Sequence, residues 1–178
     1  LGVRVANLER NADVVKWTGE ARYRYWSYRD KQADGTTAKT NTSTVQFRLF
    51  PTAEINENWK IKARLTASSN LKTDKAGNAA LTFVYANGVY DNFEINLGKM
   101  PLFSANDDGL VMDNFFTGAQ ITAGKDVKVI LEAGRWDIAG QGNSFVNAVN
   151  VNDHAGYQGI QVNYDKDKIF AGVGYRHF

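Results

Sequence analysis

Apolar and polar residues alternate with a period of two along most of the chain. The segment "NWKIKARLTAS" at 58–68 shows the pattern, with Trp59 and Ile61 on one side and Lys60 and Lys62 on the other. This period is typical of β-strands that have one apolar and one polar face. It predicts nine strands, at residues 14–28, 43–51, 58–69, 79–87, 92–99, 114–124, 126–136, 155–164 and 168–178. No helical pattern interrupts them, so the expected fold is all-β with consecutive antiparallel strands.

The connections between these predicted strands alternate between long and short. The long ones are expected at residues 29–42, 69–78, 99–114 and 137–156. The short ones are expected at residues 51–58, 87–92, 124–126 and 164–168. In an antiparallel meander this order places every long loop at one rim of the sheet, which is typical of transmembrane β-barrels.

Two interpretations remain for the alternating faces. In a soluble β-barrel that binds a ligand, the apolar face is the core and the charged face meets water. In a membrane barrel the apolar face meets lipid and the polar face lines a lumen. Aromatic residues at the strand ends, such as Trp17, Trp59, Tyr90 and Trp136, favour the membrane barrel because they suit two membrane interfaces. The alternative to the membrane barrel therefore covers a soluble or small-barrel β protein that binds a ligand.

Composition narrows the possibilities further. The chain of 178 residues carries 21 basic and 19 acidic residues, which gives no general attraction to nucleic acid. It has no cysteine, which excludes disulfides and thiolate metal sites. No apolar run reaches the roughly 18 residues of a membrane helix. The absence of a signal peptide at the start indicates a cytosolic or an already processed protein.

The polar faces of the first three predicted strands are rich in cations. If these strands pair in order, they form a basic wall whose members are Arg22, Arg24, Arg48, Lys60, Lys62 and Arg64. Such a wall is tolerable only where water or opposing anions screen it. The alternative is a set of ordinary solvated surface charges.

Opposing anions occur in the predicted third long loop, "KMPLFSANDDGLVMDN". It contains Asp107, Asp108 and Asp113 among several apolar residues, which favours a loop folded against the lumen wall. Acids facing bases across a narrowed lumen would favour small polar solutes and set a charge preference. An ordinary turn or a cation-binding loop are the alternatives for this segment.

No arrangement of residues indicates catalysis. The two histidines, His154 and His177, have no repeated spacing to acids, and no glycine-rich phosphate loop joins a strand to a helix. An outer-membrane phospholipase or protease barrel is the remaining enzymatic alternative. The sequence therefore predicts a protein that is not an enzyme and that has no cofactor and no metal site.

Residues 1–13 differ from the rest, because Leu1, Val5 and Leu8 recur at helical spacing. They are predicted to be the end of a helical or coiled-coil spacer, with residues 14–178 forming the N-terminal portion of a barrel. Nine strands would leave Phe178 at the long-loop rim, whereas bacterial barrels have an even strand number. We therefore expect an incomplete barrel, about nine strands of a 16-stranded whole.

The motifs "GEARYRYWSY", "INLGKMPLF…DDGLVMDNFFTGAQITAG" and "VILEAGRWD" resemble the porins of diderm Firmicutes, the Negativicutes group. Members of that family carry a surface-layer-homology domain, a coiled-coil spacer and a trimeric porin barrel. The resemblance implies a homotrimer, a constricting third loop, and cell-wall tethering through a domain that this chain lacks.

Together these features predict a bacterial outer-membrane porin. Its partners would be outer-membrane lipid and the small hydrophilic solutes and ions that diffuse through it.

Overall fold

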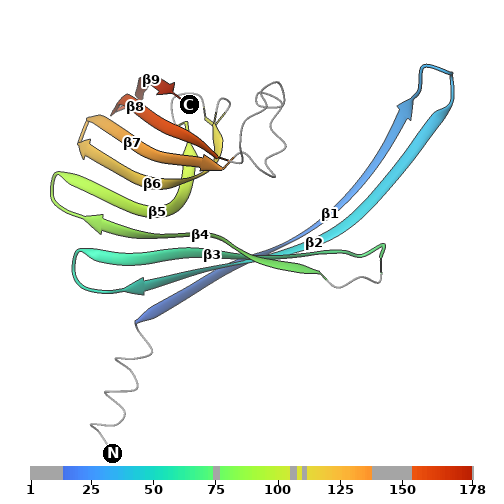
Figure 1. Cartoon of the computed structure of the whole chain (residues 1–178), viewed down its shortest axis with the longest axis horizontal. Coiled ribbons are helices and arrows are strands. Elements are labelled where there is room, and N and C mark those ends of the chain that lie inside the picture. The colour runs from blue at the N-terminus through green and yellow to red at the C-terminus, as the bar shows by residue number, and fades with distance from the viewer. Residues whose placement is uncertain (1–13, 74–76, 105–107, 110–111, 138–153, 178) are drawn as a thin grey trace, which may run out of the picture. The chain divides into compact units, whose positions relative to one another are not determined.

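The computed structural model describes residues 14–73, 77–104, 108–109, 112–137 and 154–177. Every regular element in this part of the chain is a β-strand, and all strands belong to one antiparallel sheet ordered β1 to β9 (Figure 1). The strands are β1 (Val15–Lys31), β2 (Thr37–Glu54), β3 (Trp59–Asn70), β4 (Asn78–Val89), β5 (Phe93–Phe103), β6 (Asp113–Gly124), β7 (Val127–Asp137), β8 (His154–Lys166) and β9 (Ile169–His177). The all-β prediction and its nine strands are confirmed.

The predicted long loop at 29–42 is wrong, because β1 and β2 extend through most of it. The hairpin closes over residues 32–36. Asp34 accepts hydrogen bonds of 2.9 and 2.6 Å from the backbone N–H and the hydroxyl of Thr36, and these lower the pKa of the Asp34 carboxyl. Gly35 takes a φ of 83°, which a glycine adopts without strain. The threonine-rich run that follows suits an exposed strand as well as a loop, and here it is a strand.

The other connections keep the predicted alternation. Those at one rim are residues 32–36, 71–77, 104–112 and 138–153, and those at the opposite rim are residues 55–58, 90–92, 125–126 and 167–168. Each connection at the second rim is shorter than any connection at the first. The asymmetry that favours a membrane barrel therefore survives the correction at the first hairpin.

The chain divides into two compact units. The first unit comprises residues 1–52 and 63–82, and the second comprises residues 53–62 and 83–178. In the second unit the strands from β5 to β9 curl strongly (Figure 1). The sheet remains open, so the described strands supply the antiparallel sheet of the prediction but not a closed barrel.

An apolar cluster lies on one face of the second unit, close to the connection between β5 and β6. Its members are Met100, Leu102, Met112, Phe116, Trp136 and Tyr157. Ser104 and Met112 tie the ends of this connection together, because each backbone N–H bonds an oxygen of the other residue. The connection is thereby anchored on the cluster.

Among the described residues, no helix has the length and hydropathy needed to cross a membrane. The predicted spacer at residues 1–13 and the terminal Phe178 lie outside the described residues.

Candidate functional site

In two neighbouring rows of the second unit, the polarity is inverted relative to an ordinary soluble domain, although the buried apolar cluster shares the face of the polar row. One row of directly paired residues crosses five strands with apolar side chains, namely Ile95, Ile121, Leu131, Ile160 and Tyr175. The neighbouring row on the opposite face, which we call the polar row, is Asn87, Asn96, Gln120, Glu132, Gly159 and Arg176. Leu131 is 47% exposed, whereas the adjacent Glu132 is only 4% exposed. A soluble core would show the opposite order.

Hydrogen bonds connect the side chains of the polar row from strand to strand. Asn87 donates to the Asn96 side-chain oxygen at 2.7 Å, and Asn96 donates to Gln120 at 3.0 Å. Gln120 in turn donates to Glu132 Oε1 at 2.9 Å. The chain of bonds therefore spans β4 to β7, and it satisfies amide groups that would be costly to bury alone.

Glu132 is the end point of this chain of bonds. Its second oxygen accepts a hydrogen bond of 2.5 Å from the Tyr157 hydroxyl, and Gln161 reaches its first oxygen at 3.5 Å. Gly159 makes the arrangement possible, because a Cβ there would lie 2.7 Å from both Glu132 Oε2 and the Tyr157 hydroxyl. A buried carboxylate held by several donors is a rigid polar centre.

Three glycines form a second row beside the polar row. Gly98, Gly118 and Gly134 are paired in register, with Tyr85 before them and Tyr157 after them. A Cβ on Gly118 would collide with the backbone of Ala133 and Gly134. The obstacle is backbone, so the strands approach too closely here for any side chain. Glycines at such positions mark sharp bends in a sheet, as at the corners of barrels.

Aromatic residues meet on the second unit at the rim with the short connections. The Trp59 indole lies against Gly88 and donates a 2.9 Å hydrogen bond to the Tyr90 hydroxyl. The Tyr90 ring stacks on Phe93 with centroids 4.8 Å apart. Rings with one apolar and one polar end suit a boundary between lipid and water.

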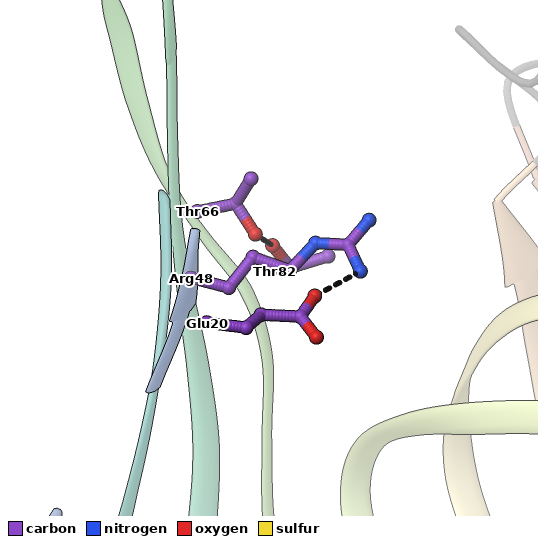
Figure 2. Close-up of polar contacts among 4 residues, drawn as sticks. All are labelled: Glu20, Arg48, Thr66 and Thr82. Carbon is purple, nitrogen blue, oxygen red and sulfur yellow. Dashed lines mark hydrogen bonds and ion pairs between the residues drawn. The ribbon is translucent and has the colours of Figure 1, made fainter. Parts of the chain in front are cut away.

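On the first unit the polar face carries charged residues. Glu20, Arg48, Thr66 and Thr82 project to the same side of their strands, as Figure 2 shows. Arg48 and Glu20 form an ion pair of 2.8 Å, and the hydroxyls of Thr66 and Thr82 are 2.8 Å apart. The period of two places Arg22 and Arg24 on the same face of β1 as Glu20.

The predicted basic wall is therefore partly neutralised. Arg48 pairs with Glu20, and Lys60 pairs with Glu54 at 3.2 Å. Lys60, Lys62 and Arg64 alternate along β3 as predicted.

The predicted acidic loop is only partly described. Asp107 lies outside the described residues, and Asp108 is exposed in the β5–β6 connection with a φ of 54°. Asp113 is the first residue of β6, where it pairs with Phe103. It alternates with the buried Asn114, so its backbone belongs to the strand and not to the loop. The role of all three acids in a constriction remains a prediction.

Sequence reasoning missed Glu132 and the polar row. A signal was present, because Glu132 is a single acid inside the apolar run "VKVILEAG" at a position of the polar face. The register that joins it to Gln120 and Asn96 could not be read from one sequence.

The described residues contain no group of three or more acidic or histidine side chains arranged to hold a metal ion. Comparison with models of known protein families and with curated protein sequences gives no match.

Proposed function

We propose that this chain forms part of an outer-membrane porin that lets small hydrophilic solutes diffuse through a water-filled channel. The observation that carries the proposal is the inverted polarity of two neighbouring rows in the second unit. An exposed apolar row and a polar row whose hydrogen bonds run from β4 to β7 lie next to each other on opposite faces of the second unit, as expected for strands with lipid on one side and a polar interior on the other.

Three further features support a barrel in a membrane. The connections are long at one rim and short at the other. The aromatic cluster around Trp59 lies at the rim with the short connections, where a membrane interface is expected. The row of Gly98, Gly118 and Gly134 leaves no room for side chains, and such glycine rows favour the sharp bends that barrel closure requires.

The finer points belong to the same proposal. The nine strands would be completed by others to a barrel of 16, embedded in outer-membrane lipid and assembled as a homotrimer, in keeping with the motif resemblance to porins of diderm Firmicutes. The β5–β6 connection, anchored by Ser104 and Met112, would narrow the lumen. Tethering to the cell wall would require a further N-terminal domain.

One observation favours a second candidate, a small barrel without an open channel. Several members of the polar row are buried, with Asn87 1% and Glu132 4% exposed, and Gln161 on the same face is 1% exposed. Barrels of about eight strands have interiors that side chains fill completely. In such a protein the polar row would be packing and not the wall of a channel.

Single-channel recording of the full-length protein in a planar bilayer separates the two candidates. A porin is expected to give large, ohmic conductance steps, and a threefold substructure would support the trimer. Protein that folds in detergent but gives no steps would support the filled barrel. Protein that stays soluble without detergent would contradict both and support a soluble ligand-binding barrel.

A further inference from the structure

Three side chains form a continuous stack along the polar face of β1. The guanidinium carbon of Arg24 lies over the Trp26 ring, 5.1 Å from its centroid. The Trp26 ring stacks on Tyr28 with centroids 5.7 Å apart and planes within 10°. All three residues are exposed, with Trp26 at 41%. We call this set the arginine–aromatic stack.

Exposed aromatic residues on a polar face need an explanation. The alternation along β1 puts the stack on the face of Glu20, while Tyr23 and Tyr25 occupy the opposite face. Tyr23 and Tyr25 are therefore the residues placed on the face that meets an apolar environment, and Trp26 and Tyr28 are not. Trp26 contacts Arg24 and Tyr28 stacks on Trp26, which gives the two aromatic residues a different role.

The stack restricts how Arg24 can present its charge. A free arginine side chain has many rotamers, and ordering them costs free energy when a ligand binds. A guanidinium that rests on an indole ring is already ordered. Its N–H donors lie in the plane of the group. The ring contact therefore leaves the edge of the guanidinium available for a planar, bidentate hydrogen bond to an oxyanion.

The charge around the stack favours an anion as the ligand. Arg22 lies two residues before Arg24 on the same face, and the nearest acid on the other side, Glu20, is paired with Arg48. Asp30 is two residues beyond Tyr28, at the far end of the stack. The end of the stack formed by Arg24 is thus the more positive end.

We propose that Arg24, held by Trp26, which in turn stacks on Tyr28, is a binding subsite for small oxyanions, namely carboxylates or phosphates. Arg24 would bind them through a bidentate hydrogen bond. The subsite names a solute class for the proposed channel and to that extent rests on the proposed function. Its binding chemistry does not depend on conductance, so a binding measurement can fail or succeed independently of the channel.

The test follows the indole and arginine N–H resonances of the ¹⁵N-labelled full chain, folded in detergent, during titration with sodium acetate, sodium phosphate or sodium chloride. We expect acetate and phosphate to shift the Arg24 Nε–H and Trp26 indole resonances, with chloride binding about fivefold more weakly because it cannot bridge two donors. The Trp17 indole, near the start of the strand, should not move. Equal binding of acetate and chloride would overturn the proposal and leave only a general positive field.

Two variants separate the bidentate geometry of the guanidinium from its charge. Arg24→Lys keeps the charge but loses the two parallel donors, and Trp26→Leu keeps every charge but releases the guanidinium from the ring. Both are expected to abolish the preference for acetate over chloride. The matched controls, Arg29→Lys and Tyr25→Leu, change residues on the opposite face of β1, so they should leave the preference for acetate over chloride unchanged. If Trp26→Leu retains the preference, the stack does not position Arg24 and the proposal is wrong. If a variant does not fold, the shifts in the unaltered chain still decide.

Discussion

The Tyr157 hydroxyl donates a 2.5 Å hydrogen bond to Glu132 Oε2 across the pairing of β7 and β8. Both residues are almost fully buried on the polar face, and neither is directly opposite the other in the register. The bond is diagonal, and it forms because the residue opposite Glu132 is Gly159. Gly159 thus leaves room on the polar face for two larger neighbours.

Tyr157→Phe removes this bond without changing the packing of the ring. Because the lost partner is a buried carboxylate, we expect a loss of about 2 kcal/mol in the free energy of unfolding, measured by urea titration in detergent. In a Glu132→Gln background the same change should cost about half as much, since a neutral acceptor bonds more weakly. Tyr175→Phe, on the exposed face of β9, is the control. An equal cost in both backgrounds would show that the bond is not charge-assisted.

The glycine row makes a prediction about backbone spacing. Gly118→Ala and Gly134→Ala would each drive a Cβ into the backbone of the neighbouring strand. We expect a loss of about 3 kcal/mol or failure to fold, because backbone cannot move aside as a side chain can. Gly156→Ala is the matched control, since nothing lies within 4 Å of its added Cβ. That variant should stay within about 0.5 kcal/mol of the original chain. Equal losses at Gly118, Gly134 and Gly156 would show that the close approach of the strands at the glycine row does not limit which residues fit there.

Much of the fold follows from the period of two alone. The alternation around Trp59 and Lys60 predicts β3 almost to the residue, and the other strands from β4 onward are placed to within a few residues. The strand ends near Asp34 were not predictable in the same way, because polar threonine-rich segments suit both loops and exposed strands.

The site was less predictable than the fold. Gly98, Gly118 and Gly134 are far apart in sequence and become one row only through the register of three strands. Register depends on pairwise contacts between strands and not on the pattern within any one of them. The ion pair of Arg48 with Glu20 was likewise hidden until the two strands were aligned.

The contact between Trp59 and Gly88 gives a prediction for the aromatic cluster. A Cβ on Gly88 would come within 2.8 Å of the indole, so Gly88→Ala should push the ring away and weaken its bond to Tyr90. We expect a loss of about 1 kcal/mol for Gly88→Ala and about 2 kcal/mol for Trp59→Ala. In the double variant the glycine change should cost nothing further, because the ring it disturbs is gone. Urea titration in detergent measures all three, and additive losses would contradict the contact.

The charges of β3 provide the prediction closest to the proposed function. Lys60, Lys62 and Arg64 alternate along one face, and fixed charges that face a lumen act most strongly on the ions that enter it. Changing all three to Gln should shift the reversal potential of the channel in a KCl gradient towards cations, with the permeability ratio changing roughly twofold at low salt. Glu20→Gln should shift it towards anions, since it releases the charge of Arg48. Lys166→Gln, whose lysine pairs with Asp126 at the rim with the short connections, should leave it unchanged. An unaltered potential in the triple variant would remove these cations from the channel wall, and opposite shifts in the triple variant and Glu20→Gln would place β1 to β3 in the wall of one lumen.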